Sequence, residues 1–370
     1  MLAVTKKRVA VVIARAHGRG TGDVGVGWMN WLSRAGYEVD AVSLIAIARP
    51  KDLDPTVRFL SPTSPRGLRS QIAAVRRLIS DRRIETILAS GTRANLVAIA
   101  AARSFSGAER PLVAISENAV LSIPGRRLTL RERGLLALAR QWYRHADVAL
   151  SATHPGAAEL TAAFGVPASR SLVVPRAVTD PSTVDVSRPY LPASDGAVSL
   201  VVPEPVGDAR DSHLAVLAAE VLTRRGTPTS VLAPADGDGL PQLHALADLR
   251  GVSLETYDSA GGWRRHITKR TVVFLPSDRE GFGRPLIEAA SLHVPSVAIS
   301  STLGVADAIV PGVTGELALD TQPNSIADAV ERAARLDVDG VDAWLDRFSA
   351  DTSGHLLEHA LRYAESRRAA

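Results

Sequence analysis

Residues 277–290 read SDREGFGRPLIEAA. The apolar run VVFL at residues 272–275 comes just before this stretch and is typical of a buried strand. Within the stretch, Leu286, Ile287 and Ala290 recur at the spacing of an amphipathic helix. The segment therefore predicts a strand, a glycine-containing turn and a helix. In open α/β sheets ligands bind outside the carboxyl ends of the strands, which is where such a turn lies.

Two glutamates of this stretch are candidates for ligand binding. Glu280 lies at the predicted turn, and Glu288 lies about one turn into the predicted helix. Gly281 and Gly283 let the backbone approach a ligand closely, and amide groups at a helix start suit an anion or a ring of hydroxyls. A carboxylate accepts from two neighbouring hydroxyls, so the pair could hold two sugar rings, or a sugar and a ribose. The alternative is a solvated first turn whose acids complement the helix dipole.

Apolar, strand-like runs alternate with helical patterns along both halves of the chain. In the first half, strands are predicted at residues 8–14, 37–43, 86–89, 112–115, 148–152 and 171–174, and helices around 24–32, 72–79, 94–102, 131–143 and 155–164. In the second half, strands are predicted at residues 198–202, 230–233, 252–256, 272–275 and 297–299, and helices around 213–222, 286–292 and 326–334. This alternation is typical of parallel, doubly wound sheets.

The segment at residues 179–197 separates the two series. It contains Pro181, Pro189 and Pro192 with serines and aspartates and no periodicity, so we interpret it as an interdomain linker. Residues 353–367 are predicted to form a final amphipathic helix. That helix either returns to the first domain or covers the second.

The composition is that of an ordinary soluble protein with two domains. The chain has 370 residues, of which 46% are hydrophobic and 22% charged. The net charge of +4 is too small to call for nucleic acid, and the lack of cysteine excludes disulfides and thiolate metal sites. No apolar run has the length of a membrane helix, and residues 1–15 lack the features of a secretory signal. We therefore expect a cytoplasmic protein.

Residues 276–288 resemble the signature of retaining glycosyltransferases of family 4. Members carry Pro-Ser, two further residues, Glu-Gly-Phe-Gly and a second Glu, and Pro276 to Glu288 match that spacing without a gap. Residues 301–307 and 311–317 are similar to the family's glycine turn and to its next strand. The first half also fits the family pattern, at residues 146–151, 165–167 and 173–176.

The resemblance implies the GT-B fold: an α/β protein with two Rossmann-like, doubly wound domains facing a central cleft, and a C-terminal helix returning to the first domain. The implied boundaries are 1–178 for the acceptor domain, 179–197 for the linker, 198–345 for the donor-binding domain and 346–370 for the returning helix. The implied reaction transfers a sugar, with retention, from a nucleotide diphosphate sugar. The acceptor is left open among a lipid, a glycan, a small metabolite and a protein, and no metal or other cofactor is expected.

The resemblance also assigns roles to single residues. It implies that Glu280 and Asn118 take part in catalysis and that Arg93, Asn95 and Glu117 lie on the acceptor side. It implies donor binding by Gly20, Thr21, Gly22, Arg210, Gly281, Phe282, Gly283, Glu288, Leu303 and Gly304. Within this set, Glu280 and the amides of residues 281–283 would hold the sugar, and Glu288 would hold the ribose.

Three departures from the family pattern affect the chemistry. Many relatives carry Gly-Arg after the first strand of the second domain and a lysine a few residues further on, and both reach the donor diphosphate. Here that segment, residues 202–210, lacks the first basic residue and offers only Arg210 for the second. Asn118 stands where one branch has a histidine, so it can hydrogen-bond but cannot titrate. Residues 20–22, Gly-Thr-Gly, stand for the usual paired glycines.

These departures and one other motif leave further functions open. A non-catalytic sugar-nucleotide-binding protein of the same fold would explain the missing basic and histidine positions. A nucleotide-sugar epimerase shares the architecture. A nicotinamide oxidoreductase is a further candidate, because residues 20–25 match G-x-G-x-x-G and Asp40 follows near the end of the second strand. Residues 15–19 separate that glycine motif from the first strand, which counts against this candidate.

Two features have both a structural and a functional interpretation. Asp236-Gly237-Asp238 resembles a metal-binding D-x-D, but a surface turn after a strand explains it, and we expect no metal site. The basic helix around residues 126–144, with leucines among its arginines, is either a solvated face covering the core or a surface for an anionic membrane. Peripheral contact with the inner face of the membrane therefore stays an alternative.

Overall fold

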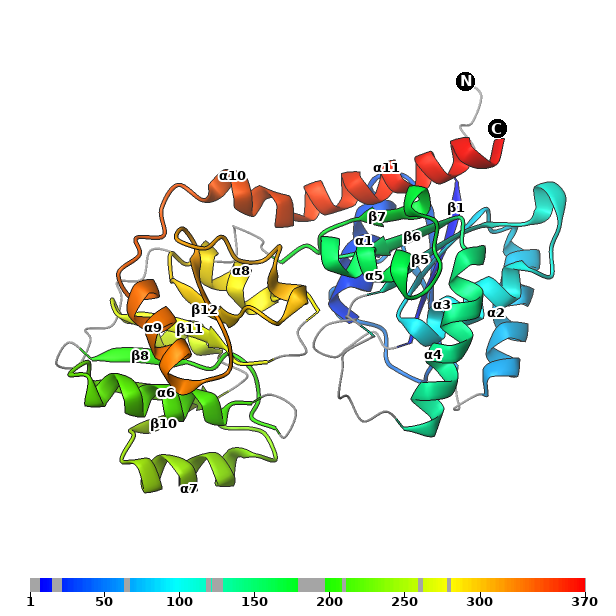
Figure 1. Ribbon diagram of the computed structural model, residues 1–370. Coiled ribbons are helices and arrows are strands. Elements are labelled where there is room, and N and C mark those ends of the chain that lie inside the picture. Colours follow the sequence, from blue (N-terminus) through cyan, green and yellow to red (C-terminus); the bar gives the residue numbers. More distant parts are fainter. Residues whose placement is uncertain are drawn as a thin grey trace. The chain divides into compact units, whose positions relative to one another are not determined.

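A computed structural model of the chain describes residues 7–14, 22–62, 67–117, 121, 129–178, 197–207, 211–258, 262–277 and 281–369 (Figure 1). The chain divides into two compact units. Unit 1 comprises Met1–Ala177 and Arg347–Ala370, and unit 2 comprises Val178–Asp346. The predicted linker, apart from its last residue, lies outside the described residues.

Unit 1 contains a parallel sheet of seven strands in the order β3-β2-β1-β4-β5-β6-β7. The strands are β1 (Arg8–Ile13), β2 (Glu38–Ser43), β3 (Arg58–Leu60), β4 (Thr86–Ser90), β5 (Leu112–Glu117), β6 (Val148–Ser151) and β7 (Ser171–Val173). Both faces of the central strands are buried, which explains why β1, β4, β5 and β6 are largely continuous apolar runs rather than alternating ones. In β1, for example, Val9 and Val11 face one core while Ala10 and Val12 face the other.

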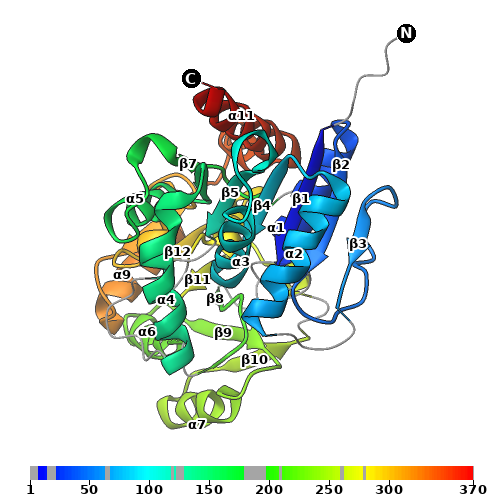
Figure 2. The same cartoon turned by 90° about the vertical axis from the view of Figure 1, so that its right-hand side faces the viewer.

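Helices cover the two faces of the unit 1 sheet. They are α1 (Gly22–Arg34), α2 (Leu68–Arg82), α3 (Thr92–Ala102), α4 (Leu130–Trp142), α5 (His154–Ala162) and α11 (Ala350–Ala369). The core that contains Val9 is shared with α1 and α11, and the core that contains Ala10 is shared with α2, α3, α4 and α5. Figure 2 shows α2, α3 and α4 in front of the strands on that second face. The third glycine of the G-x-G-x-x-G match, Gly25, lets α1 lie close to β1, because a Cβ there would be 3.0 Å from Ile13 Cγ2.

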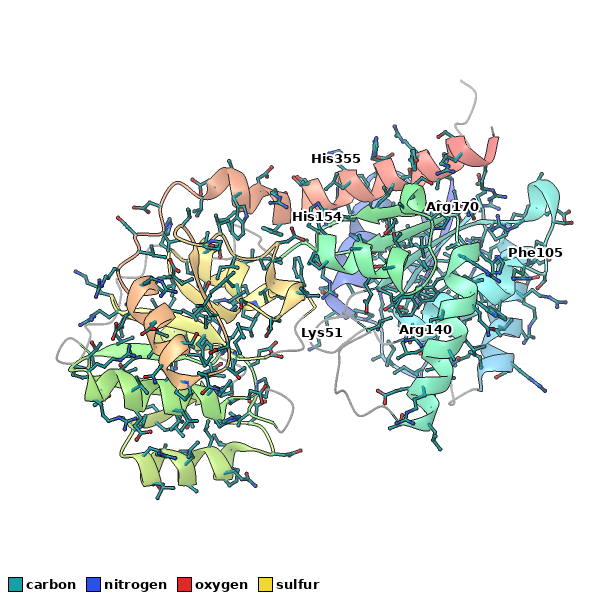
Figure 3. The ribbon with its side chains drawn as sticks, viewed as in Figure 1. Lys51, Phe105, Arg140, His154, Arg170 and His355 are labelled. Carbon is teal, nitrogen blue, oxygen red and sulfur yellow. The ribbon has the colours of Figure 1, made fainter. Side chains whose placement is uncertain are left out.

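The C-terminal helix α11 packs on α1 in unit 1, which is the first of the two alternatives that the sequence left open. Trp28 Nε1 donates to Ser353 Oγ at 3.1 Å, and Ser353 Oγ donates to the carbonyl of Pro175 at 2.7 Å. A Cβ on Gly354 would lie 2.2 Å from the indole of Trp31, so glycine is what allows this close approach. His355, on the same helix in Figure 3, meets the Trp31 ring edge-on at a centroid distance of 5.2 Å.

Unit 2 contains a second parallel sheet, of six strands in the order β10-β9-β8-β11-β12-β13. The strands are β8 (Val198–Val201), β9 (Thr229–Pro234), β10 (Leu254–Tyr257), β11 (Thr271–Leu275), β12 (Ser296–Ile299) and β13 (Gly315–Ala318). The helices are α6 (His213–Arg224), α7 (Leu240–Arg250), α8 (Arg284–Ser291), α9 (Pro323–Ala333) and α10 (Asp342–Leu345). One core packs α6, α7 and α9 on the sheet, and a smaller one packs residues of α8 and Trp263 on the other face.

Both sheets confirm the predicted fold class of two Rossmann-like α/β units. In each, the strand order reverses next to the first strand, at β1/β4 and at β8/β11, and such switch points are where ligands bind in this architecture. The strand β3 and the helices α7 and α10 were not predicted from the sequence. The edge strand β3 has only three, partly exposed residues, and α7 buries only Leu243 and Ala247. Neither therefore has a strong periodic pattern.

Candidate active site

The strand, turn and helix predicted around residue 281 form in unit 2 as β11, a glycine turn and α8. Gly283 caps α8 with φ of +76°, a left-handed conformation that favours glycine. A Cβ there would also lie 2.8 Å from Ala308 Cβ. At the end of β11, Thr302 Oγ1 donates to the carbonyl of Ser277 at 2.9 Å, which ties this turn to the segment after β12. The turn is therefore fixed by backbone conformation and by close packing.

The residues beside this turn differ in what they offer a ligand. The ring of Phe282 is buried, with 1% of its surface exposed, so it anchors the turn in the core. Gly304, in the 3-10 turn Leu303–Val305, is also buried, whereas Leu303 is 60% exposed. The predicted donor contacts at residues 281–283 therefore depend on the backbone. Beside this turn, the side chain of Leu303 is exposed to solvent.

Glu288 lies on α8 with its carboxylate held by two arginines. Arg284 Nε donates to Glu288 Oε1 at 2.9 Å, and a guanidinium nitrogen of Arg264 lies 2.8 Å from the same oxygen. The glutamate side chain is 12% exposed, while the two arginine side chains are nearly half exposed. Among the described residues, Glu288 Oε2 accepts no hydrogen bond. One oxygen is thus fixed by positive charge and the other remains able to accept from a ligand.

Arg264 was not identified from the sequence. It lies in the 3-10 turn Trp263–His266 between β10 and β11, and the fold brings it to Glu288. The buried ring of the preceding residue, Trp263, anchors that turn in the smaller core of unit 2. The one signal for Arg264 in the sequence is a basic cluster at residues 264–270, which a solvated surface explains equally well.

In unit 1, Glu117 lies at the carboxyl end of β5 inside a buried polar network. Asn95 Nδ2 donates to Glu117 Oε1 at 2.9 Å and to the carbonyl of Ser116 at 3.0 Å. The hydroxyl of Tyr143 donates to the same Glu117 oxygen. Burial raises the pKa of Glu117 to about 7, although hydrogen bonds from Tyr143, Thr92 and Asn95 oppose that rise. This carboxyl group can therefore gain or lose a proton near neutral pH.

The three predicted acceptor-side residues occupy different depths. Asn95 is fully buried and Glu117 is 6% exposed, so both lie beneath the surface and bind each other. Arg93 lies nearer the surface, where its Nε donates to Gln71 Oε1 at 2.9 Å. Tyr143, which completes the buried network, was not identified, because its position at the end of a helical pattern favours a core role.

Several predicted site residues fall outside the described residues. These are Gly20, Thr21, Asn118, Arg210 and Glu280. Gly22 is the first residue of α1. Asp236 and Asp238 are exposed in the turn after β9, where a Cβ on Gly237 would lie 2.0 Å from the carbonyl oxygen of Val206. Across the described residues there is no group of three or more His, Cys, Asp or Glu side chains placed to hold a metal ion.

In the part of the chain that the structure describes, none of the helices combines the length and the apolar character needed to cross a bilayer.

Two family models match the chain, one in each half. A model described as Glycosyltransferase Family 4 matches residues 25–180, and one described as Glycosyl transferases group 1 matches residues 246–338. The second match includes the glycine turn, Glu288 and Arg264. None of the curated proteins matches the chain.

Solved structures with the same fold cover almost the whole chain. The lipopolysaccharide outer core galactosyltransferase WaaB in its apo form is 16% identical, with a TM-score of 0.75 over 96% of this chain and 99% of its own. Anabaena Alr3699/HepE in complex with UDP is 14% identical, with a TM-score of 0.70 over 96% of this chain and 99% of its own. The UDP-N-acetylglucosamine 2-epimerase of Rickettsia bellii is 12% identical, with a TM-score of 0.57 over 98% of this chain and 96% of its own.

The fold and the two family matches define the class of protein. The chain is a glycosyltransferase of the GT-B type.

Proposed function

We propose that the chain is a retaining glycosyltransferase that uses a nucleotide diphosphate sugar and needs no metal ion. This proposal rests on the contacts of the Glu288 carboxylate. Its Oε1 is held by Arg264 and Arg284, while its Oε2 accepts no hydrogen bond from a described residue. A carboxylate fixed in this way suits a ribose diol. The complex of the similar protein HepE with UDP supports a nucleotide as the ligand.

The proposed donor site lies in unit 2. Glu288 would bind the ribose, and Glu280 with the amides of residues 281–283 would bind the sugar. The turn at Leu303 and Gly304 would lie beside the diphosphate, with Arg210 as a further contact. The guanidinium groups of Arg264 and Arg284 would add positive charge near the nucleotide, where the usual basic residues are missing.

The proposed acceptor side lies in unit 1, at Arg93 and above the buried pair Asn95 and Glu117, with Asn118 next in the chain. In a retaining transfer the acceptor hydroxyl attacks the anomeric carbon on the face from which the diphosphate departs. The carbon–oxygen bond to the diphosphate breaks, the new glycosidic bond forms, and the hydroxyl proton moves to a phosphate oxygen of the donor. This route uses the donor itself as the base and requires no titrating side chain at position 118.

Turnover of a nucleotide sugar by the purified protein tests this proposal. We expect slow release of the nucleotide without an acceptor, and the sugar released first should keep its anomeric configuration in a proton NMR spectrum. Glu280→Ala should abolish release, while Glu255→Ala, at an exposed position on β10, should leave it unchanged. Turnover that is unchanged by Glu280→Ala would overturn the proposed role of this residue.

An epimerase and a non-catalytic binding protein give different results in the same experiment. The fold shared with the Rickettsia bellii epimerase keeps the first alternative open, and an epimerase would return an epimeric sugar. A non-catalytic relative would bind a nucleotide sugar without turnover. Binding of a nicotinamide nucleotide in place of a nucleotide sugar would instead favour the oxidoreductase.

A further inference from the structure

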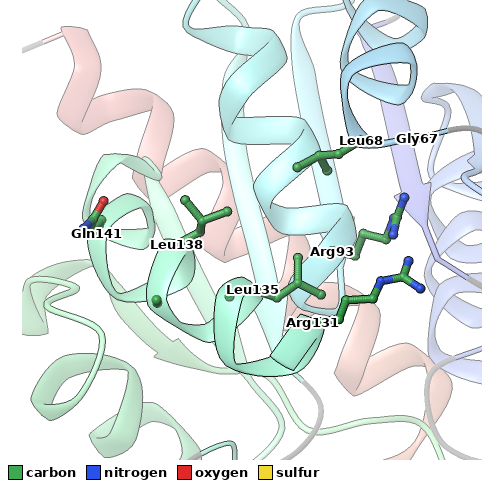
Figure 4. Close-up of a pocket in the computed structure, with 9 residues that line it drawn as sticks. Gly67, Leu68, Arg93, Arg131, Leu135, Leu138 and Gln141 are labelled. Carbon is green, nitrogen blue, oxygen red and sulfur yellow. The ribbon is translucent and has the colours of Figure 1, made fainter. Parts of the chain in front are cut away.

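A pocket of about 610 Å³ opens on unit 1 (Figure 4). The first residues of α2 and α3 form one side of it, and one face of α4 forms the other. Its size is that of sites for small ligands. The side chains that decide its chemistry are those of Leu68, Arg93, Arg131, Leu135, Leu138 and Gln141.

Positive charge is concentrated at the mouth of this pocket. Arg93 and Arg131 are each the second residue of their helices, α3 and α4, where the helix dipole disfavours a cation. The first turns of α2 and α3 contain no acidic residue. Burial and the neighbouring Arg131 cation lower the pKa of Arg93. In Figure 4 the two guanidinium groups extend toward the same side of the pocket.

The polar groups beside the two arginines include a buried amide and an acid that accepts hydrogen bonds from its own helix start. Gln71 is buried and bridges the carbonyl of Leu44, at 2.7 Å, to Arg93 Nε, at 2.9 Å, so a fixed, neutral amide is one partner of the Arg93 side chain. Glu132 is the acid in the first turn of α4, but its carboxylate accepts from the backbone and hydroxyl of Thr129 at 2.8 and 2.9 Å. Arg131 forms no ion pair with any residue that the structure describes. Two cations at helix starts, one of them fixed, therefore favour a dianion.

The rest of the pocket is apolar. Leu135 and Leu138 are three residues apart on α4, so they lie on one face of that helix, and Leu68 faces them from α2. All three are partly buried against the core beneath and keep some surface toward the pocket. A ligand that fills this space must carry an anionic group next to an alkyl portion.

We propose that this pocket binds an alkyl phosphate, with the phosphate between Arg93 and Arg131 and the alkyl chain along Leu68, Leu135 and Leu138. Two guanidinium groups match the charge and the hydrogen-bonding geometry of a phosphate better than those of a single carboxylate. In the proposed transferase the alkyl phosphate would be part of the acceptor, and this assignment rests on the proposed function. The binding of an alkyl phosphate to the pocket does not depend on that function.

Isothermal titration of the full chain with three probes tests this proposal. We expect hexyl phosphate to bind at least about tenfold more tightly than inorganic phosphate, because it buries several methylene groups. We also expect it to bind at least about tenfold more tightly than neutral hexyl glucoside, because its charge pairs with the arginines. Arg131→Ala, at an exposed position, should bring the affinity for hexyl phosphate down to that for hexyl glucoside. Leu135→Asn should bring it down to that for inorganic phosphate.

The controls lie on the same helix. Arg133 and Arg140 are exposed on α4 and do not line the pocket, so Arg133→Ala and Arg140→Ala should bind hexyl phosphate as the wild type does. Arg140 is labelled in Figure 3. Equal affinities of the wild type for all three probes would overturn the proposal, and so would equal losses in Arg131→Ala and Arg133→Ala.

A titration of nucleotide sugars with the same samples separates the two proposals. Hexyl phosphate that does not bind, beside a nucleotide sugar that does, overturns the alkyl phosphate site and leaves the transferase proposal intact. Hexyl phosphate that binds as predicted, beside nucleotide sugars that do not, supports the pocket and contradicts the proposed function.

Discussion

A guanidinium nitrogen of Arg264 lies 2.8 Å from Glu288 Oε1, and this contact links a residue without any motif to the second glutamate of the signature. Arg284, four residues before Glu288 on α8, holds the same oxygen from within the helix. Together they set the orientation of the one carboxylate of the signature pair that the structure describes.

Replacing Arg264 by alanine should weaken binding of a nucleotide sugar while leaving the fold intact. The loss of one orienting contact should raise Kd by about tenfold, and the free energy of unfolding should change by less than about 1 kcal/mol because Arg264 is nearly half exposed. Isothermal titration and urea unfolding measure the two effects. Arg265→Ala, at the exposed neighbouring position, is the control, and an equal rise in Kd for both variants would contradict the account.

Two glycines with the same φ angle allow the cost of backbone strain to be compared with the cost of close packing at the donor turn. Gly283 and Gly312 both have φ of +76°, but a Cβ on Gly283 would lie 2.8 Å from Ala308 Cβ, whereas one on Gly312 would meet nothing within 4 Å. Both alanine variants should lose about 1 kcal/mol to backbone strain, and Gly283→Ala should lose about 1–3 kcal/mol more. Chemical denaturation of the two variants measures this difference. Equal losses would show that the packing at Gly283 is looser than described.

The contact between α11 and α1 depends on Gly354. An alanine at this position would place its Cβ 2.2 Å from the indole of Trp31, so we expect Gly354→Ala to reduce the free energy of unfolding by about 1–3 kcal/mol. Gly27→Ala on α1 meets nothing within 4 Å and should be neutral or stabilising by up to about 1 kcal/mol. Thermal and urea unfolding of both variants provide the comparison. A Gly354→Ala variant as stable as Gly27→Ala would rule out this helix contact.

The buried Glu117 should make stability depend on pH. Its pKa in the folded chain is raised from 4.5 to about 7, so the folded state holds this proton more tightly than the unfolded state does. Stability should therefore be unaffected by this group below pH 4.5, fall as pH rises through 7, and stay lower above that value. The total loss is on the order of 3 kcal/mol, from about 1.4 kcal/mol for each pKa unit.

Glu117→Gln tests this pH dependence. The variant keeps a hydrogen-bonding side chain but cannot ionise, so the part of the pH dependence due to Glu117 should disappear between pH 5 and pH 8. Urea unfolding of both proteins at the two pH values measures the difference. A variant that loses as much stability as the wild type between these values would show that Glu117 is not the titrating group.

The sequence predicts the architecture well because most elements have strong local signals. The buried strands are unbroken apolar runs, and Gly283 marks the turn from β11 to α8, so Glu288 could be placed on a helix after a strand. The edge strand β3 has no such signal, since its three residues are partly exposed.

The contacts that complete each site could not be predicted, because they join residues from separate elements. Arg264 meets Glu288 only through the packing of the Trp263 turn on the sheet. Tyr143, in the 3-10 turn that follows α4, meets Glu117 only once that turn has packed beside α3. Each of these residues has an ordinary role by local pattern, as a solvated cation or as a core aromatic. Their partners are fixed by the tertiary fold, which periodicity along the chain does not encode.

Titration of the wild type and of Glu288→Ala with nucleotide sugars, starting with UDP-glucose and continuing through donors with other bases, tests the central claim most directly. We predict that at least one nucleotide sugar binds the wild type and that Glu288→Ala raises its Kd by at least about tenfold, because the hydrogen bonds of a ribose diol to a charged group are lost. Glu255→Ala should bind as the wild type does. Failure of every nucleotide sugar to bind at millimolar concentration, or equal affinity in Glu288→Ala and the wild type, would contradict the account.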